Sequence, residues 1–255
     1  MDGLWQYPVV VFVLSFAGLW WSGRIGASFR SRWKLAEDQR NDFGIVQGAS
    51  LTLLGLIIGF SFSMATGRYD QRKNYEEEEA NAIGTEYLRA DLLPASDGTK
   101  VRQLLKSYLD QRLLFYKTRN VRRLRQIDEA TGRLQADLWA ACVAPAMANP
   151  SPLTALATSG MNDVLNSQGY TLAAWRNHIP TAAWILMEVI AVGCNLLIGY
   201  GARHARIRAS DFIILPLVVS VSFFLIADLD SPHGGVIRVG PQNLVSLSQS
   251  LPAEP

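Results

Sequence analysis

The stretch Gly44–Ala65 reads GIVQGASLTLLGLIIGFSFSMA and contains no charged residue. An apolar helix of about 20 residues is long enough to cross the hydrocarbon layer of a bilayer, which is roughly 30 Å thick. We therefore predict that this stretch is a membrane-spanning helix and that the protein is an integral membrane protein.

The composition of the whole chain agrees with this prediction. Of its 255 residues, 49% are hydrophobic and 18% are charged, against about 25% charged in soluble domains. The apolar residues gather in four blocks, at about 8–21, 44–65, 181–201 and 212–227. This pattern excludes a conventional soluble enzyme, a disordered protein and a disulfide scaffold. We predict four transmembrane helices, and we expect Cys142 and Cys194 to be unpaired apolar residues.

The region between the second and third blocks has the pattern of a helical domain. Its apolar residues recur every three or four positions, as at Val101, Leu105 and Tyr108, and no alternating strand pattern occurs. Prolines at 94, 145, 150 and 152 are expected to separate its helices. We predict an all-α protein with transmembrane helices 1 and 2 in 1–67, a helical extramembrane domain in 68–178, transmembrane helices 3 and 4 in 179–230, and a C-terminal tail in 231–255.

The loops between the spans carry the charges that set orientation. Basic residues occur between the first two spans at Arg24, Arg30, Arg32, Lys34 and Arg40, and between the last two at Arg203, Arg206 and Arg208. Because basic loops stay on the cytoplasmic side, this pattern favours cytoplasmic loops and a 68–178 domain on the opposite side.

No motif for catalysis or for a cofactor is present. The histidines His178, His204 and His233 lie in separate segments without metal-ligand spacing, and no phosphate loop or nucleophile motif occurs. We therefore expect neither an enzyme nor a metal site. The run Glu76–Glu79 is interpreted as a solvated helix face rather than a cation site. The basic residues at 117–125 are interpreted as a solvated or lipid-facing surface, since no aromatic residues for nucleic-acid binding accompany them.

The third span contains two polar residues. Glu188 has apolar neighbours on both sides, and Asn195 follows seven residues later on roughly the same helix face. An ionisable group inside the membrane is costly unless it faces a cavity or a partner. Two interpretations stay open: a functional residue that faces a pore or cavity, and a structural hydrogen bond within the bundle.

The second span carries two overlapping patterns. Small residues recur along it, with Gly55, Gly59 and Ser63 as the core of a stripe that would allow close helix packing. On an adjoining face lie Leu56 and Phe60. If several copies of this helix surrounded an axis, Leu56 and Phe60 would form apolar rings, and such rings can gate a pore by dewetting.

Parts of the chain resemble the bestrophin family. The stretch Ile58–Ser63 (IGFSFS) followed by Arg68–Arg72 (RYDQR) is similar to the segment in which a Gly-Phe element ends the membrane part of the bestrophin pore helix. The stretch Ala227–Gly235 (ADLDSPHGG) resembles the acidic segment of the family that contains Pro and Gly. The bestrophin-like group known as domain of unknown function 4239 is more similar still, at Glu79–Thr85, Tyr87–Pro94, Arg176–Pro180 and Asp228–Gly235.

This resemblance implies a pentameric ion channel in the cell (inner) membrane, with lipid, other copies of the chain and inorganic ions as partners, and no nucleic acid. It implies a pore constriction at Leu56 and Phe60. The post-helix acidic turn (Asp228, Asp230, Pro232 and Gly234) would cap helix ends or brace neighbouring subunits. The acidic cluster that follows this turn in calcium-activated members is absent, so calcium activation is not expected.

Two points stay open. The bestrophin layout places the 68–178 domain in the cytoplasm, opposite to the orientation that the loop charges favour. The alternative function is a non-conducting membrane scaffold or sensor whose helical domain binds a partner. A membrane enzyme that uses Glu188 and Asn195 has no supporting motif.

Overall fold

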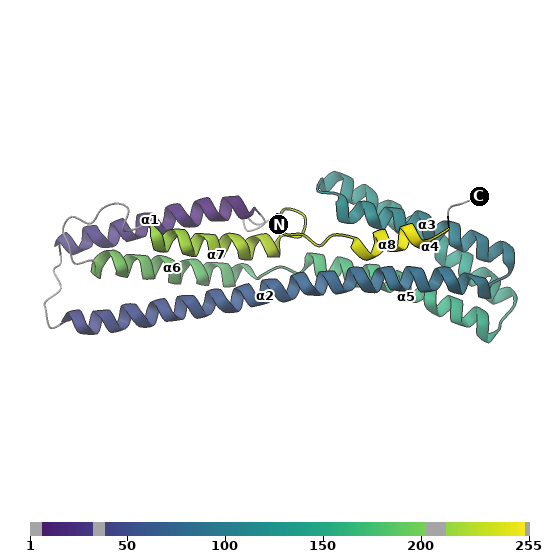
Figure 1. Ribbon diagram of the computed structural model, residues 1–255, viewed down its shortest axis with the longest axis horizontal. Coiled ribbons are helices and arrows are strands. Elements are labelled where there is room, and N and C mark those ends of the chain that lie inside the picture. Colours follow the sequence, from purple (N-terminus) through teal and green to yellow (C-terminus); the bar gives the residue numbers. More distant parts are fainter. Residues whose placement is uncertain (1–6, 33–38, 202–212, 253–255) are drawn as a thin grey trace. The chain divides into compact units, whose positions relative to one another are not determined.

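The computed structural model describes residues 7–32, 39–201 and 213–252, and within these ranges it is helical and contains no strand (Figure 1). This confirms the prediction of an all-α fold. The predicted basic loop residues Lys34, Arg203, Arg206 and Arg208, together with His204 and Phe212, lie outside the described ranges. The helices are α1 (Pro8–Arg32), α2 (Gln39–Arg89), η2 (Ala90–Leu92), α3 (Ala95–Lys117), α4 (Val121–Ala148), α5 (Pro152–Arg176), α6 (Thr181–Gly201), α7 (Ile214–Asp230) and α8 (Gln242–Ser250).

Three helical segments of the described chain are long and apolar enough to cross a membrane: Pro8–Phe29, Gln39–Leu92 and Pro152–Gly201. These segments contain the first three predicted spans. The fourth predicted span corresponds to α7, which has only 17 residues and is not among them. The arrangement of four spans is therefore not confirmed and stays a prediction.

The chain divides into two compact units. Unit 1 comprises Met1–Tyr69 and His178–Arg238, and unit 2 comprises Asp70–Asn177 and Val239–Pro255. Helix α2 is unbroken between Gln39 and Arg89, so one helix contributes residues to both units. The predicted tail, 231–255, is divided between the two units: its first part, up to Arg238, belongs to unit 1, and Val239–Pro255, which contains α8, belongs to unit 2.

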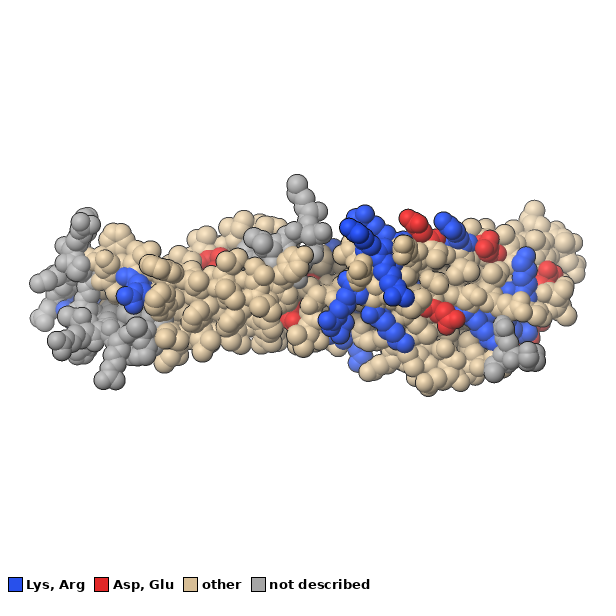
Figure 2. All heavy atoms as spheres, turned by 90° about the horizontal axis from the view of Figure 1, so that it is seen from above, with Lys and Arg blue, Asp and Glu red and all other residues tan. Residues whose placement is uncertain are grey.

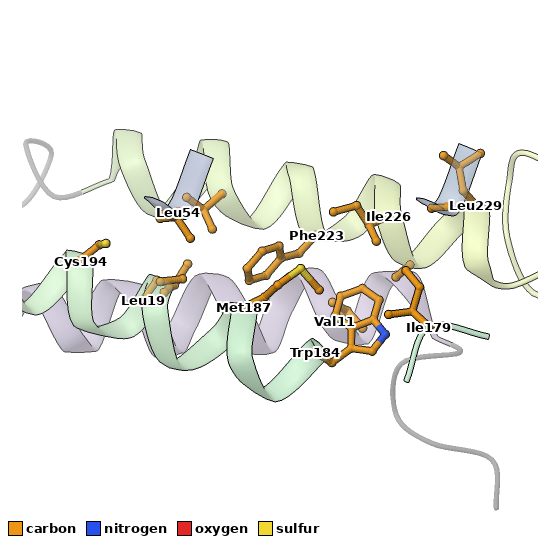
Figure 3. Packing of buried hydrophobic residues seen from close by; sticks show 14 residues of the cluster. Val11, Leu19, Leu54, Ile179, Trp184, Met187, Cys194, Phe223, Ile226 and Leu229 are labelled. Carbon is orange, nitrogen blue, oxygen red and sulfur yellow. The ribbon is translucent and has the colours of Figure 1, made fainter. Parts of the chain in front are cut away.

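The core of unit 1 is formed where α1 packs against α6 and α7. Large apolar side chains from these helices interlock there (Figure 3), with the ring of Trp184 edge-on to that of Phe223 at a centroid distance of 6.4 Å. Helix α2 adds Leu54 and Ala65 to this core. The other members that are less than 1% exposed are Leu19, Met187, Ala191, Ile226 and Ala227.

Two helices of unit 2, α4 and α5, begin at capping residues. The Asn120 side chain accepts hydrogen bonds from the backbone N–H groups of Arg122 and Arg123, which starts α4. Ser151 and Thr154 form a capping box at the start of α5, where Pro152 occupies the first turn. The break predicted at Pro145 is wrong, because this proline lies inside α4. It removes one backbone donor near the helix end, and the Asn149 N–H still donates to the Pro145 carbonyl oxygen at 2.9 Å.

The apolar face predicted for α3 forms part of the core of unit 2, because Val101, Leu105 and Tyr108 are completely buried. The C-terminal helix α8 packs on this unit through α2. The carboxylate of Glu76 accepts hydrogen bonds from the Leu244 backbone N–H at 2.9 Å and from the Asn243 side-chain amide at 2.7 Å. Glu76 therefore caps the start of α8, which fixes the C-terminal segment on the helical domain.

Candidate functional site

In unit 1, only a narrow face of α2 is buried against the core. Leu54, Ser61 and Ala65 are buried, and Leu51, Ile57 and Ile58 are half-buried against the core. These positions recur every three or four residues, so they form a single stripe along the helix. The rest of the circumference of α2 is not covered by the described part of the chain.

The predicted constriction residues lie on this uncovered side. The side chains of Leu56 and Phe60 are 53% and 63% exposed, and the neighbouring Leu53, Phe62 and Met64 are also exposed. Leu56 and Phe60 are separated by one helical turn, so both point to the same side of α2. A strip of large apolar side chains of this kind needs lipid or another protein surface to cover it.

The small-residue stripe of α2 also lacks a neighbour. A Cβ atom added at Gly48, Gly55 or Gly59 would meet no atom within 4 Å, and Ser63 is exposed. The hydroxyl of Thr52 donates to the Gly48 carbonyl oxygen of the same helix. The stripe therefore packs against no described helix of its own chain.

Close helix packing occurs instead between α1 and α6. A Cβ atom at Gly199 would overlap the Gly23 carbonyl oxygen and lie 2.9 Å from the Ala27 amide nitrogen, and one at Gly26 would overlap the Leu196 carbonyl oxygen. The Ser22 hydroxyl donates to the Val192 carbonyl oxygen at 2.7 Å. This contact was not predicted from the sequence, although the small residues of the Ser22–Ala27 stretch were a signal for it.

Glu188 and Asn195 make separate contacts and form no hydrogen bond with each other. The Ser15 hydroxyl of α1 donates to Glu188, which joins α1 to α6. The side-chain amide of Asn195 donates to the Ala191 carbonyl oxygen of its own helix at 2.9 Å. These contacts favour the structural interpretation of both residues, because each satisfies a polar group inside the bundle.

The two aspartates of the post-helix acidic turn bind groups within unit 1. The carboxylate of Asp228 accepts hydrogen bonds from the backbone N–H groups of Val236 and Ile237, both at 2.7 Å. Asp230 accepts from the Ile179 N–H at 2.9 Å and lies 3.3 Å from the Arg68 guanidinium. The turn thus ties the end of α7 to the start of α6 and to α2.

The glycine that this turn requires is Gly235, which was not among the predicted site residues. A Cβ atom at Gly235 would overlap the Asp228 carbonyl oxygen, whereas the predicted Gly234 is exposed. Pro232 is buried. In the described part of the chain, no group of three or more His, Cys, Asp or Glu side chains is arranged to hold a metal ion.

The prediction for the run Glu76–Glu79 is wrong for two of its members. Glu77 and Glu78 are exposed, but Glu76 and Glu79 are buried. Positions three apart share a helix face, and this face points into unit 2. Glu79 forms a completely buried ion pair with Arg112 and accepts hydrogen bonds from the hydroxyls of Tyr116 and Thr171, each at 3.2 Å.

Glu86 lies on the same buried face of α2 as Glu76 and Glu79, but it differs from them in its hydrogen bonding. It is completely buried, and neither of its carboxyl oxygens has a hydrogen-bond partner in the described structure. Burial raises the pKa of the Glu86 carboxyl to about 8; the nearby Arg89 opposes this rise and Asp163 adds to it. The carboxyl is therefore largely protonated at neutral pH.

The chain matches a known protein family over most of its length. A family model for the bestrophin-like domain matches residues 19–244. The chain belongs to the bestrophin-like family. A comparison with curated proteins finds no match.

Bacterial bestrophin homologues from Klebsiella pneumoniae are similar in fold. One crystal structure has a TM-score of 0.61 at 14% sequence identity and covers 96% of this chain and 99% of its own. A point mutant of a K. pneumoniae homologue gives a TM-score of 0.61 at 13% identity, over 94% and 97% of the two chains. At this identity the similarity shows a shared fold, and the function rests on further argument.

Proposed function

We propose that several copies of this bestrophin-like chain, most simply five, surround an axis in the cell (inner) membrane and form an ion channel lined by α2. The observation that carries this proposal is the uncovered side of α2. Large apolar side chains and a glycine stripe share one helix, and nothing in the described chain packs on them. A neighbouring copy of α2 could cover the stripe, because small residues allow helix backbones to approach closely.

In this arrangement Leu56 and Phe60 form the pore constriction. Each contributes one apolar side chain per subunit, so five copies give two adjacent rings one helical turn apart. Rings of this kind resist hydration, and a small outward movement of the helices would let water and ions enter. The turn with Asp228 and Asp230 holds the ends of the surrounding helices in place within each subunit.

The first test is the mass of the purified protein in nanodiscs, followed by ion flux in liposomes. We expect a pentamer, and we expect Phe60→Ala to raise conductance while the oligomer stays intact, since the substitution widens the ring. Val13→Ala, at an exposed position of α1, is the matched control and should leave flux unchanged. A monomer or dimer, or a Phe60→Ala protein with unchanged currents, would contradict the proposed pore.

The second candidate function is a non-conducting scaffold or sensor. It is supported by exposed apolar side chains in unit 2, where Met147 is 77% and Leu153 is 56% exposed. Exposed residues of this kind suit a protein partner. An intact oligomer that conducts no ions in any variant would favour this function.

A further inference from the structure

The turn between α3 and α4 carries a dense set of cations. Lys117, Arg119, Arg122, Arg123 and Arg125 are all exposed, and none of them has a carboxylate within ion-pair distance among the described residues. The first turn of α4 contains no acidic residue. A helix N-terminus is itself partly positive, so it adds to the positive charge at this turn, and no carboxylate of the described residues pairs with these cations.

Contacts within unit 2 place this turn beside the residues through which the chain enters and leaves the unit. The guanidinium of Arg72 donates to the carbonyl oxygens of Ala174 and Asn177, at the end of α5, at 3.2 and 3.1 Å. Next to them, the Trp175 ring lies 5.0 Å from that of Phe115 and 5.3 Å from that of Tyr116. These two aromatic residues directly precede Lys117 at the end of α3.

This end of unit 2 lies close in the sequence to the apolar segment of α2. Arg72 follows Ala65, the last residue of that segment, by only seven positions of one unbroken helix. On the other side, α6 begins only four residues after Asn177. The cations therefore belong to the end of the domain from which both membrane-spanning segments continue.

We call this region the basic end; it comprises Lys73, Lys117, Arg119, Arg122, Arg123, Arg125 and Arg176, which are all exposed. Figure 2 shows Lys and Arg atoms gathered in this part of unit 2, with few Asp and Glu atoms among them. The acidic residues within four positions of these cations are Asp70, Glu76, Glu77, Asp128 and Glu129, and Glu76 is engaged by the start of α8. The stretch 117–125 itself holds five cations and no acidic residue, which leaves a positive excess at this turn.

We propose that the basic end binds the headgroups of acidic phospholipids in the bilayer that the chain spans. Guanidinium groups bind phosphate oxygens in a bidentate manner, and each cation near an anionic membrane surface adds to the attraction. The apolar side chain of Val121, 61% exposed among these cations, suits the boundary between headgroups and acyl chains. Residues 117–125 include no aromatic side chain on which a nucleic-acid base could stack, so lipid is the favoured partner.

The test uses the full chain in detergent, titrated with short-chain phosphatidylglycerol and, separately, short-chain phosphatidylcholine, with bound lipid counted by native mass spectrometry. We expect phosphatidylglycerol to bind at least tenfold more tightly. The double variant Arg122→Gln/Arg123→Gln should lose about tenfold in affinity for phosphatidylglycerol. The matched control, Lys100→Gln/Arg133→Gln, removes two exposed cations of α3 and α4 outside the basic end and should bind like the unmodified chain.

Melting curves of both variants check that the fold is intact, and Arg119→Gln/Arg125→Gln replaces the first variant if that one unfolds. Equal binding of the two lipids, or an equal loss in the control, would overturn the proposal. Displacement of the lipid by the same concentration of inorganic phosphate would show a simple anion site instead. If a single-stranded oligonucleotide displaces the lipid from the unmodified chain, and no longer binds to the Arg122→Gln/Arg123→Gln variant, the surface would be assigned to nucleic acid instead.

Discussion

Among single residues, Glu86 stands out because its carboxyl is completely buried and has no hydrogen-bond partner in the described structure. Its pKa is raised from 4.5 to about 8. The folded chain therefore holds a proton on Glu86 that the unfolded chain releases above pH 4.5. Linkage then requires that folding stability falls as the pH rises from 4.5 through 8, because the charge must form inside the protein.

We expect Glu86→Gln to remove this pH dependence, because the amide has the same shape and stays neutral. The apparent melting temperature at pH 8.5 should rise by about 4 °C, with little change at pH 4.5. The exposed Glu77→Gln on the same helix is the control and should change neither value. A Glu86→Gln protein that melts at the same temperature as the unmodified chain at pH 8.5 would show that Glu86 is ionised in the folded state without cost.

At the scale of helices, the contact between α1 and α6 depends on glycine. A methyl group at Gly199 would overlap backbone atoms of α1, which cannot rotate away as a side chain can. Gly193, on the same helix, has nothing within 4 Å of the added atom. We expect Gly199→Ala to destabilise the protein by about 1–3 kcal/mol, and Gly193→Ala to have no such effect. Denaturation in graded sodium dodecyl sulfate measures both, and equal stability of the two variants would contradict the close packing.

At the scale of the whole molecule, a substitution in the glycine stripe of α2 tests whether this stripe holds the oligomer together. Because a side chain at Gly55 meets nothing in its own chain, Gly55→Leu should leave the fold of each subunit unchanged but weaken the oligomer. Native mass spectrometry should show smaller species, with helix content unchanged by circular dichroism. Gly18→Leu on α1, also in open space, is the control. If the Gly55→Leu variant still forms an intact oligomer, the glycine stripe is not part of the interface between subunits.

The orientation of the molecule can be predicted from the basic end. Basic residues close to the membrane favour the cytoplasmic side, and contacts within unit 2 bring the end of α3, which precedes the cations at 117–125, beside the end of α5, to which Arg72 donates. We therefore expect the helical domain to be cytoplasmic. In right-side-out vesicles, Ser96→Cys should react with an impermeable thiol reagent only after permeabilisation, and Asn41→Cys should react before it. The reverse pattern would restore the orientation that the loop charges favour.

Features that repeat along one helix could be predicted from the sequence. The buried face of α3 at Val101, Leu105 and Tyr108 follows directly from apolar periodicity. Features that depend on a distant partner could not be predicted. Glu79 can be buried because it pairs with Arg112, which is 33 residues away in the sequence. Glu76 can be buried because it accepts a hydrogen bond from the Leu244 amide, which is 168 residues away. The close contact between the glycines of α1 and the backbone of α6 could not be predicted either, because the position of a glycine in the sequence does not indicate which backbone packs against it.

The packing of α1 on α6 and α7 has a consequence for biosynthesis. Helix α1 ends at Arg32 and its main neighbour α6 begins at Thr181, so roughly 150 residues must leave the ribosome between them, which takes about 7–30 s at common translation rates. During this interval α1 rests in the bilayer with its small-residue surface open to lipid. The tightest contact of unit 1 therefore forms late, after the helical domain between these two helices has been synthesised.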